Sequence, residues 1–96
     1  IMKDNYATTN GSKYTISNAW HSIEIEWKKA TAVGANNGYL SLWIDGTLVG
    51  TISNVDNDLW TLDFVQLGAT ASVDSTTSGS MLFDNFISKR YSYIGQ

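Results

Sequence analysis

Several residue types are absent from this chain of 96 residues or scarce in it. It has no cysteine, no proline and one histidine, His21. The absence of cysteine excludes disulfides, thiolate metal sites and cysteine nucleophiles. A single histidine excludes a multi-histidine metal site within the chain. We expect His21 to be a structural residue at the start of a strand.

Charged residues are scarce as well. They make up 16% of the chain, the net charge is −3, and no basic run is longer than Lys28-Lys29 or Lys89-Arg90. We therefore expect no nucleic acid partner. No apolar run is long enough to span a bilayer, so we expect no membrane insertion. The hydrophobic content of 43% is typical of a folded globular protein, and the length suits one domain, residues 1–96.

Short strand-forming segments separated by turn residues run along the whole chain. The clearest apolar–polar alternation lies between His21 and Lys28 and is typical of a half-buried strand. Asn10-Gly11 is a dipeptide typical of hairpin turns. No segment has a convincing helical period, so we predict an all-β fold, an antiparallel β-sandwich or jelly roll. The expected strands cover residues 2–8, 13–16, 21–28, 59–67 and 81–90, with a hairpin over residues 38–54.

The hairpin is predicted from the segment GYLSLWIDGTLVGTISN, residues 38–54. Its Asp45-Gly46 pair tolerates the positive φ angles of a tight two-residue turn. Such a turn pairs Ile44 with Thr47, Trp43 with Leu48, Leu42 with Val49 and Tyr39 with Ile52.

In this register both faces of the hairpin carry apolar residues, whereas a sheet with one face in water alternates cleanly. We therefore expect both faces to be covered. We assign Trp43, Leu48 and Ile52 to an interface with other strands or another chain. The two predicted sets are Leu40, Leu42, Ile44 and Val49 on one face, and Tyr39, Trp43, Leu48 and Ile52 on the other.

Several phrases of the sequence, taken together and in order, carry a family resemblance. They are Trp20-His21 with Ile23-Glu24-Ile25 and Trp27, then residues 38–46, 65–68, 78–80 and 83–86. This set resembles the C-terminal half of the concanavalin A-like lectin/glucanase superfamily, in particular bacterial laminin-G-like jelly-roll domains, over residues 14–90. The resemblance implies two large antiparallel sheets packed face to face in a domain of about twice this length. It thus implies a partial domain, completed by other strands or by another chain.

The resemblance also implies a function. The leading interpretation is a non-enzymatic, lectin-like module of an extracellular or cell-surface protein, which binds glycans or serves adhesion. An alternative is a structural assembly subunit of a surface layer or filament, which pairs its strands with those of neighbours, as in a homo-oligomer. A third interpretation, a glycoside hydrolase fragment, would need acids from outside the chain.

Glu24 and Glu26 are the candidates for catalysis. They share one face of a predicted strand, with side chains about 7 Å apart, whereas retaining glycosidases hold their two carboxyl groups about 5 to 5.5 Å apart. Lys28 takes the next position on that face, where the resembling glucanase motif continues to another acid. The motif is broken, so we expect a solvated strand face balanced by Lys28 and no enzyme.

Carbohydrate binding needs an exposed aromatic ring with amides or carboxylates beside it. Trp60, which follows Asp56, Asn57 and Asp58, is the best candidate for such a platform. Trp43 and Tyr39 come next, if their face is the concave one. Trp20 and Trp27 are predicted to be core residues.

Calcium is the one cofactor that the sequence brings into question. Asp56 and Asp58 concentrate oxygen ligands in one loop, as hard cations require. Their spacing is not that of an EF-hand loop, and Asp and Asn also occur in loops because they stabilise turns. Both interpretations stay open on the sequence alone.

Overall fold

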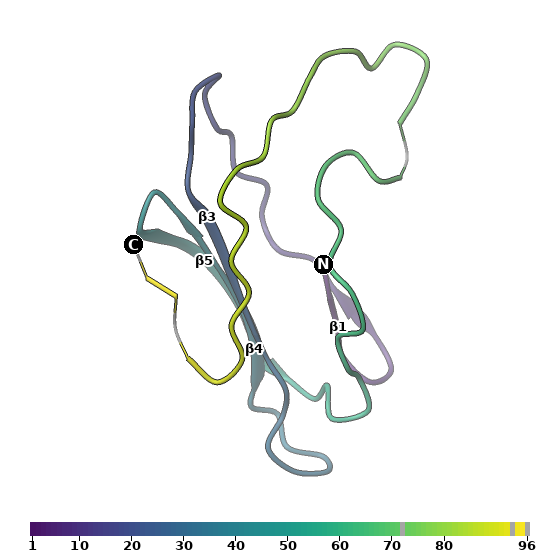
Figure 1. The fold of residues 1–96 in the computed structure, drawn as a ribbon. Helices are drawn as coiled ribbons and strands as arrows, with labels where there is room; N and C mark the ends of the chain where they lie inside the picture. The colour runs from purple at the N-terminus through teal and green to yellow at the C-terminus, as the bar shows by residue number, and fades with distance from the viewer. Residues whose placement is uncertain (72, 93, 96) are drawn as a thin grey trace.

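The computed structural model describes residues 1–71, 73–92 and 94–95. These residues form five β-strands and no helix, which confirms the predicted all-β class. They include no helix long and apolar enough to cross a bilayer. β1 (Met2–Lys3) and β2 (Thr8–Thr9) form a short antiparallel pair. β3 (Ile23–Lys28), β4 (Gly38–Ile44) and β5 (Thr47–Val55) form an antiparallel sheet in the order β3-β4-β5 (Figure 1).

The central hairpin forms where the Asp-Gly pair predicts it. Asp45 has a φ of 51° and Gly46 a φ of 76°, the positive angles of a tight hairpin turn. Ile44 pairs with Thr47, and Trp43 with Leu48, as predicted.

Beyond these two pairs the predicted register is wrong, because β5 contains two bulges. Leu42 pairs with Gly50 instead of Val49, and Leu40 instead of Tyr39 pairs with Ile52. Val49 is therefore an extra residue in β5. The residues that follow it, as far as the second bulge, point to the opposite face of the sheet from the predicted one. A second shift precedes the pair of Gly38 with Val55, next to Asn54, whose φ is 57°.

The bulges sort the side chains of the sheet into an apolar and a polar face. Residues that lie opposite each other in an antiparallel pair share a face. Ile52 therefore joins Leu40 and does not lie with Trp43 and Leu48, so the predicted interface set is split between the two faces. The apolar face carries Ile23, Ile25, Trp27, Leu40, Leu42, Ile44 and Ile52, and the polar face carries Glu24, Glu26, Lys28, Tyr39, Ser41, Trp43 and Leu48.

The apolar face is covered only in part. Tyr14 lies over Gly50, where a Cβ would be 2.9 Å from its Cζ atom, and a Cβ on Gly11 would be 3.4 Å from the Ile52 side chain. At the other edge of the face, Ile23 is 50% exposed and Ile25 is 63% exposed. The half-buried strand predicted from the alternation of β3 therefore has the predicted parity but not the predicted burial.

The core lies at one end of the sheet and centres on Asn57. The buried apolar side chains among the described residues are Met2, Ala30 and Val55, and Asn57 is fully buried. Asn57 Oδ1 accepts a hydrogen bond from the Ala30 amide at 2.7 Å, and its Nδ2 donates to the Lys28 carbonyl at 3.1 Å. A Cβ on Gly38 would collide with the same amide group, so β4 must begin with glycine here. We call these contacts the Asn57 clamp.

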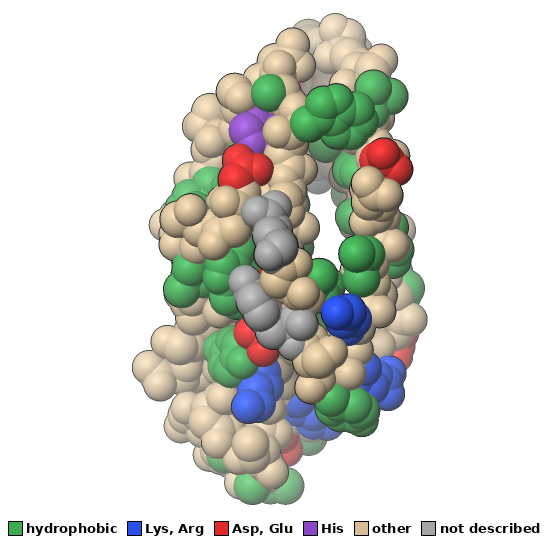
Figure 2. All heavy atoms as spheres, turned by 60° about the vertical axis from the view of Figure 1, so that its left-hand side comes forward, with side chains coloured by type: hydrophobic (Ala, Val, Ile, Leu, Met, Phe, Trp, Pro, Cys, Tyr) green, Lys and Arg blue, Asp and Glu red, His purple; other side chains and the backbone are tan. Residues whose placement is uncertain are grey.

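Several predicted strands do not form in the described residues. The N-terminal hairpin turns at residues 4–7 instead of Asn10-Gly11, and residues 13–16, 59–67 and 81–90 belong to no strand. Their apolar side chains, including Phe64, Phe83 and Phe86, are exposed. Trp20 is 72% exposed and is not a core residue. Alternation of apolar and polar residues does not form a strand unless another strand pairs with it. Figure 2 shows hydrophobic side chains on the surface and a gap within the molecule.

We expect replacement of Asn57 by alanine to lower the free energy of unfolding by about 1 to 3 kcal/mol, because it leaves the Ala30 amide without its partner and removes one of the hydrogen bonds to the Lys28 carbonyl. Urea unfolding followed by circular dichroism measures the change. The matched control is Asn36→Ala, on an exposed residue of the β3–β4 loop. Equal effects of the two substitutions would show that the clamp does not stabilise the sheet.

Candidate functional site

The loop after β5 is held in place by the N-terminal hairpin. The backbone amide of Asn5 donates to the Asp56 carbonyl at 2.7 Å, and the backbone amide of Leu59 donates to Asn5 Oδ1 at 3.1 Å. Asn5 Nδ2 donates to the Asp58 carboxylate. The Trp60 amide closes a turn on the Asn57 carbonyl at 3.1 Å. One asparagine therefore fixes the start of the loop, and the turn fixes Trp60 at its end.

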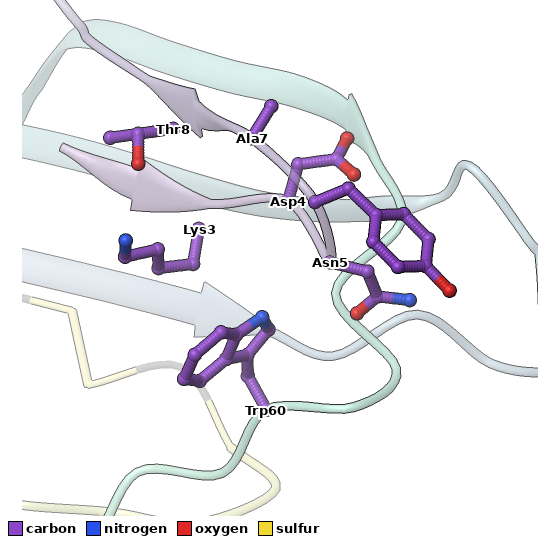
Figure 3. Close-up of a pocket in the computed structure, with 7 residues that line it drawn as sticks. Lys3, Asp4, Asn5, Ala7, Thr8 and Trp60 are labelled. Atoms are coloured by element: carbon purple, nitrogen blue, oxygen red, sulfur yellow. The ribbon is translucent and has the colours of Figure 1, made fainter.

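Trp60 forms one wall of a hollow between this loop and the N-terminal hairpin. The hollow has a volume of about 310 Å³. The Trp60 side chain is 42% exposed, and the Lys3 Nζ atom lies 6.0 Å from the centre of its ring, within cation–π range. Figure 3 shows Lys3 and the indole ring facing each other beneath the hairpin. The lining residues are Lys3, Asp4, Asn5, Tyr6, Ala7, Thr8 and Trp60.

Two carboxyl groups behind the hollow share a hydrogen bond. The bond to Asp58 raises the pKa of Asp56, and partial burial raises it further. The hydrogen bond from the side-chain amide of Asn5 lowers the pKa of Asp58, as does the bond to Asp56. Asp56 Oδ1 is buried, and no donor among the described residues faces it. Asp56 therefore keeps its proton to higher pH than Asp58 does.

Asp56 and Asp58 lie together, as calcium ligands would, but the described residues contain no group of three or more histidine or acidic side chains placed to hold a metal ion. The third nearby carboxylate, Asp4, accepts a hydrogen bond from the Asp56 amide at 3.4 Å. The Asp58 carboxylate takes part in the structure of the loop through Asn5, and calcium binding by Asp56 and Asp58 stays a prediction.

The other predicted sugar-binding residues lie elsewhere. Asn57 is fully buried in the clamp and cannot reach a ligand. Tyr39 and Trp43 lie on the polar face of the sheet and do not line the Trp60 hollow. The Tyr39 hydroxyl donates to Glu26 at 2.7 Å, which raises the pKa of Tyr39. The Lys28 Nζ atom lies 5.7 Å from the centre of the Tyr39 ring.

His21 has the structural role predicted for it. Its Nδ1 lies 2.7 Å from Asp45 Oδ2, and its Nε2 lies 3.0 Å from Ser17 Oγ. The bond to His21 and a bond from the Ser22 amide lower the pKa of Asp45. His21 therefore joins the start of β3 to the turn of the central hairpin.

A second hollow, of about 510 Å³, was not predicted from the sequence. It separates the start of β3 from the C-terminal segment, with Trp20, Ile23 and Glu24 on one side and Asp84 and Ile87 on the other. Glu24 accepts hydrogen bonds from the amides of Ile94, at 3.2 Å, and Gly95, at 3.4 Å. The sequence does not indicate this hollow, because the position of Trp20 next to an alternating strand predicts a core residue, whereas Trp20 is exposed and lines the hollow.

Replacement of Asp56 by asparagine is expected to raise the melting temperature at about pH 7 and to change it little at about pH 3. The raised pKa of Asp56 means that ionising this group, as the pH rises through the raised value, costs folding stability. Asparagine has no charge to acquire. Thermal unfolding at both pH values measures the difference, with Asp63→Asn, on an exposed residue, as the control. A lower melting temperature at neutral pH would contradict the proton-sharing pair.

Comparisons of the chain with protein-family models, with curated proteins and with solved structures found no match. The family resemblance of the sequence therefore stays an expectation. Function has to be inferred from the geometry of the molecule.

Proposed function

We propose that this chain is a non-enzymatic, lectin-like module that binds a glycan in the hollow beside Trp60. One observation carries this proposal: a partly exposed indole faces a hollow of about 310 Å³ whose other walls are mainly polar. A sugar ring presents an apolar face and a rim of hydroxyl groups, and this hollow offers a surface for each.

The polar groups around Trp60 differ in what they can offer a ligand. The Lys3 ammonium group and the Thr8 hydroxyl can both donate hydrogen bonds to sugar oxygens. Asn5 is already committed to the loop through both ends of its side-chain amide. Lys3 would also favour an acidic sugar, because the ammonium group attracts a carboxylate or sulfate.

The finer points of the fold belong to the same proposal. We infer that the apolar face of the sheet is one layer of a sandwich or jelly roll and that a second layer packs on it. Exposed Ile23 and Ile25 support this inference, since soluble domains rarely leave a contiguous apolar surface of this kind open. The assignment to an extracellular or cell-surface protein rests on the sequence resemblance.

The carboxylates of the sheet support a function without catalysis. Glu26 accepts the Tyr39 hydroxyl, and Glu24 accepts two backbone amides of the C-terminal segment. Both are therefore engaged in holding the structure together. Neither lines the Trp60 hollow.

A second function, assembly through strand pairing, is favoured by a separate observation. β3 forms one edge of the sheet, and no strand pairs with its outer side in the described residues. An open edge of this kind is a template for another strand.

Replacement of Trp60 by alanine is expected to weaken glycan binding about tenfold, or roughly 1.4 kcal/mol, because the apolar platform for the sugar is lost. Ligand-observed NMR with a panel of neutral and acidic oligosaccharides provides the measurement. Trp20→Ala is the matched control, since Trp20 is an exposed tryptophan outside this hollow.

Two results would contradict the proposal. Absence of binding to every oligosaccharide by the folded protein would remove the lectin function. Binding that depends on Trp20 and not on Trp60 would place the site in the second hollow.

A further inference from the structure

We propose that the outer edge of β3 is an assembly site that pairs, in antiparallel orientation, with β3 of a second copy of this chain, around a two-fold axis at Trp27. The inference rests on the assembly function proposed above and is independent of glycan binding. The occupant is the same strand of another molecule, so the contact is closed and symmetric.

The hydrogen-bond pattern of the sheet shows which backbone groups of β3 point outward. The Asp45 amide donates to the Ser22 carbonyl at 2.9 Å, which makes Ser22 and Asp45 a hydrogen-bonded pair. Such pairs alternate along an antiparallel ladder, so Glu24, Glu26 and Lys28 bond to β4. The amides and carbonyls of the intervening residues, Ile23, Ile25 and Trp27, therefore face away from the sheet.

These outward groups are open to another strand. The described residues place no strand against them, and the side chains of Ile23 and Ile25 are 50% and 63% exposed. Proteins that keep an edge strand apart from others shield it with proline, bulges, a covering loop or charged side chains. The chain has no proline, and both bulges of the sheet lie between β4 and β5, on the opposite side from this edge. The charged side chains of β3 have both signs, so those of two copies can pair with one another.

The charges on β3 select one register for the pairing of two copies. Outward groups can pair only with outward groups, so the two-fold axis passes through a residue of β3 and not between two residues. An axis at Glu24 or at Lys28 places two like charges directly opposite each other. An axis at Ile25 places Glu24 opposite Glu26 of the other copy, twice. An axis at Glu26 places two Glu26 side chains directly opposite each other. An axis at Trp27 places Glu26 opposite Lys28, twice, with no pair of like charges.

Among the described residues, the β3 side of the second hollow ends at Glu24. An axis at Trp27 uses the other half of the strand, from Ile25 onward, followed by Lys29. Pairing there joins two three-stranded sheets into one of six strands, in which the two apolar faces lie side by side.

Reversal of the charges on β3 tests the pairing and its register. Glu26→Lys alone places lysine opposite Lys28 twice, and Lys28→Glu alone places glutamate opposite Glu26 twice. Each is expected to weaken dimerisation about tenfold or more. The double variant E26K/K28E restores two opposite-charge pairs and is expected to recover the affinity of the original chain. Analytical ultracentrifugation of the whole chain over a range of concentrations measures dimerisation.

Two further variants separate the edge from general effects on folding. Ile25→Pro removes an amide that points outward and bonds to nothing in β4, so it is expected to give a monomer with the circular dichroism spectrum of the original chain. Asp63→Lys makes the same change of charge as Glu26→Lys on an exposed residue outside the strands and is expected to leave dimerisation unchanged.

The outcomes distinguish the site from the function on which it rests. A folded chain that stays monomeric at high concentration overturns both the β3 pairing and the assembly function. An oligomer that survives Ile25→Pro, or whose dissociation by the single charge reversals is not rescued in E26K/K28E, retains the assembly function and overturns this site. An open filament in place of a dimer also overturns the proposed two-fold contact.

Discussion

The side-chain amide of Asn57 is the interaction on which the rest of the molecule depends. It accepts a hydrogen bond from the Ala30 amide and donates one to the Lys28 carbonyl. β4 can approach it only because Gly38 has no side chain. The ends of three strands meet at this one buried group, next to Val55. A buried polar group with all its partners fixes one arrangement of its surroundings, since any other arrangement leaves a donor or acceptor unpaired.

The regions proposed to bind ligands are built outward from this clamp. The turn that follows Asn57 presents Trp60, and the N-terminal hairpin completes the hollow through Asn5. In the other direction the clamp ends β3, whose outer edge pairs with no strand in the part of the chain that the structure describes. Glycan binding and assembly would thus both depend on one anchored structure.

Local features of the sequence predict the local features of the structure. The alternation of β3 gives its parity, and Asp45-Gly46 gives the turn of the central hairpin, because both depend on a few neighbouring residues. The exposure of the Trp60 ring is likewise predicted. Its partners Lys3 and Asn5 are far away in the sequence, and no short pattern connects them to it. The same limit explains why residues 59–67 and 81–90 alternate like strands but do not pair.

The predicted register fails for a different physical reason. Gly50 has to lie beneath Tyr14, a contact between distant segments that requires one extra residue in β5. No residue near Val49 in the sequence indicates that β5 needs this extra residue. Asn57, similarly, looks like an ordinary turn residue until its burial is known.

The two bulges of β5 together make the length of this strand a constrained quantity. The first reverses which face each later residue occupies, and the second reverses it back, so that Val55 shares the face of Leu40 and Leu42. Loss of a single residue between the turn and Val55 would rotate Val55 out of the core and carry Asn57 with it. Loss of one residue from each bulge would keep both inside. In a lineage of such chains, insertions and deletions in β5 should therefore accumulate in compensating pairs.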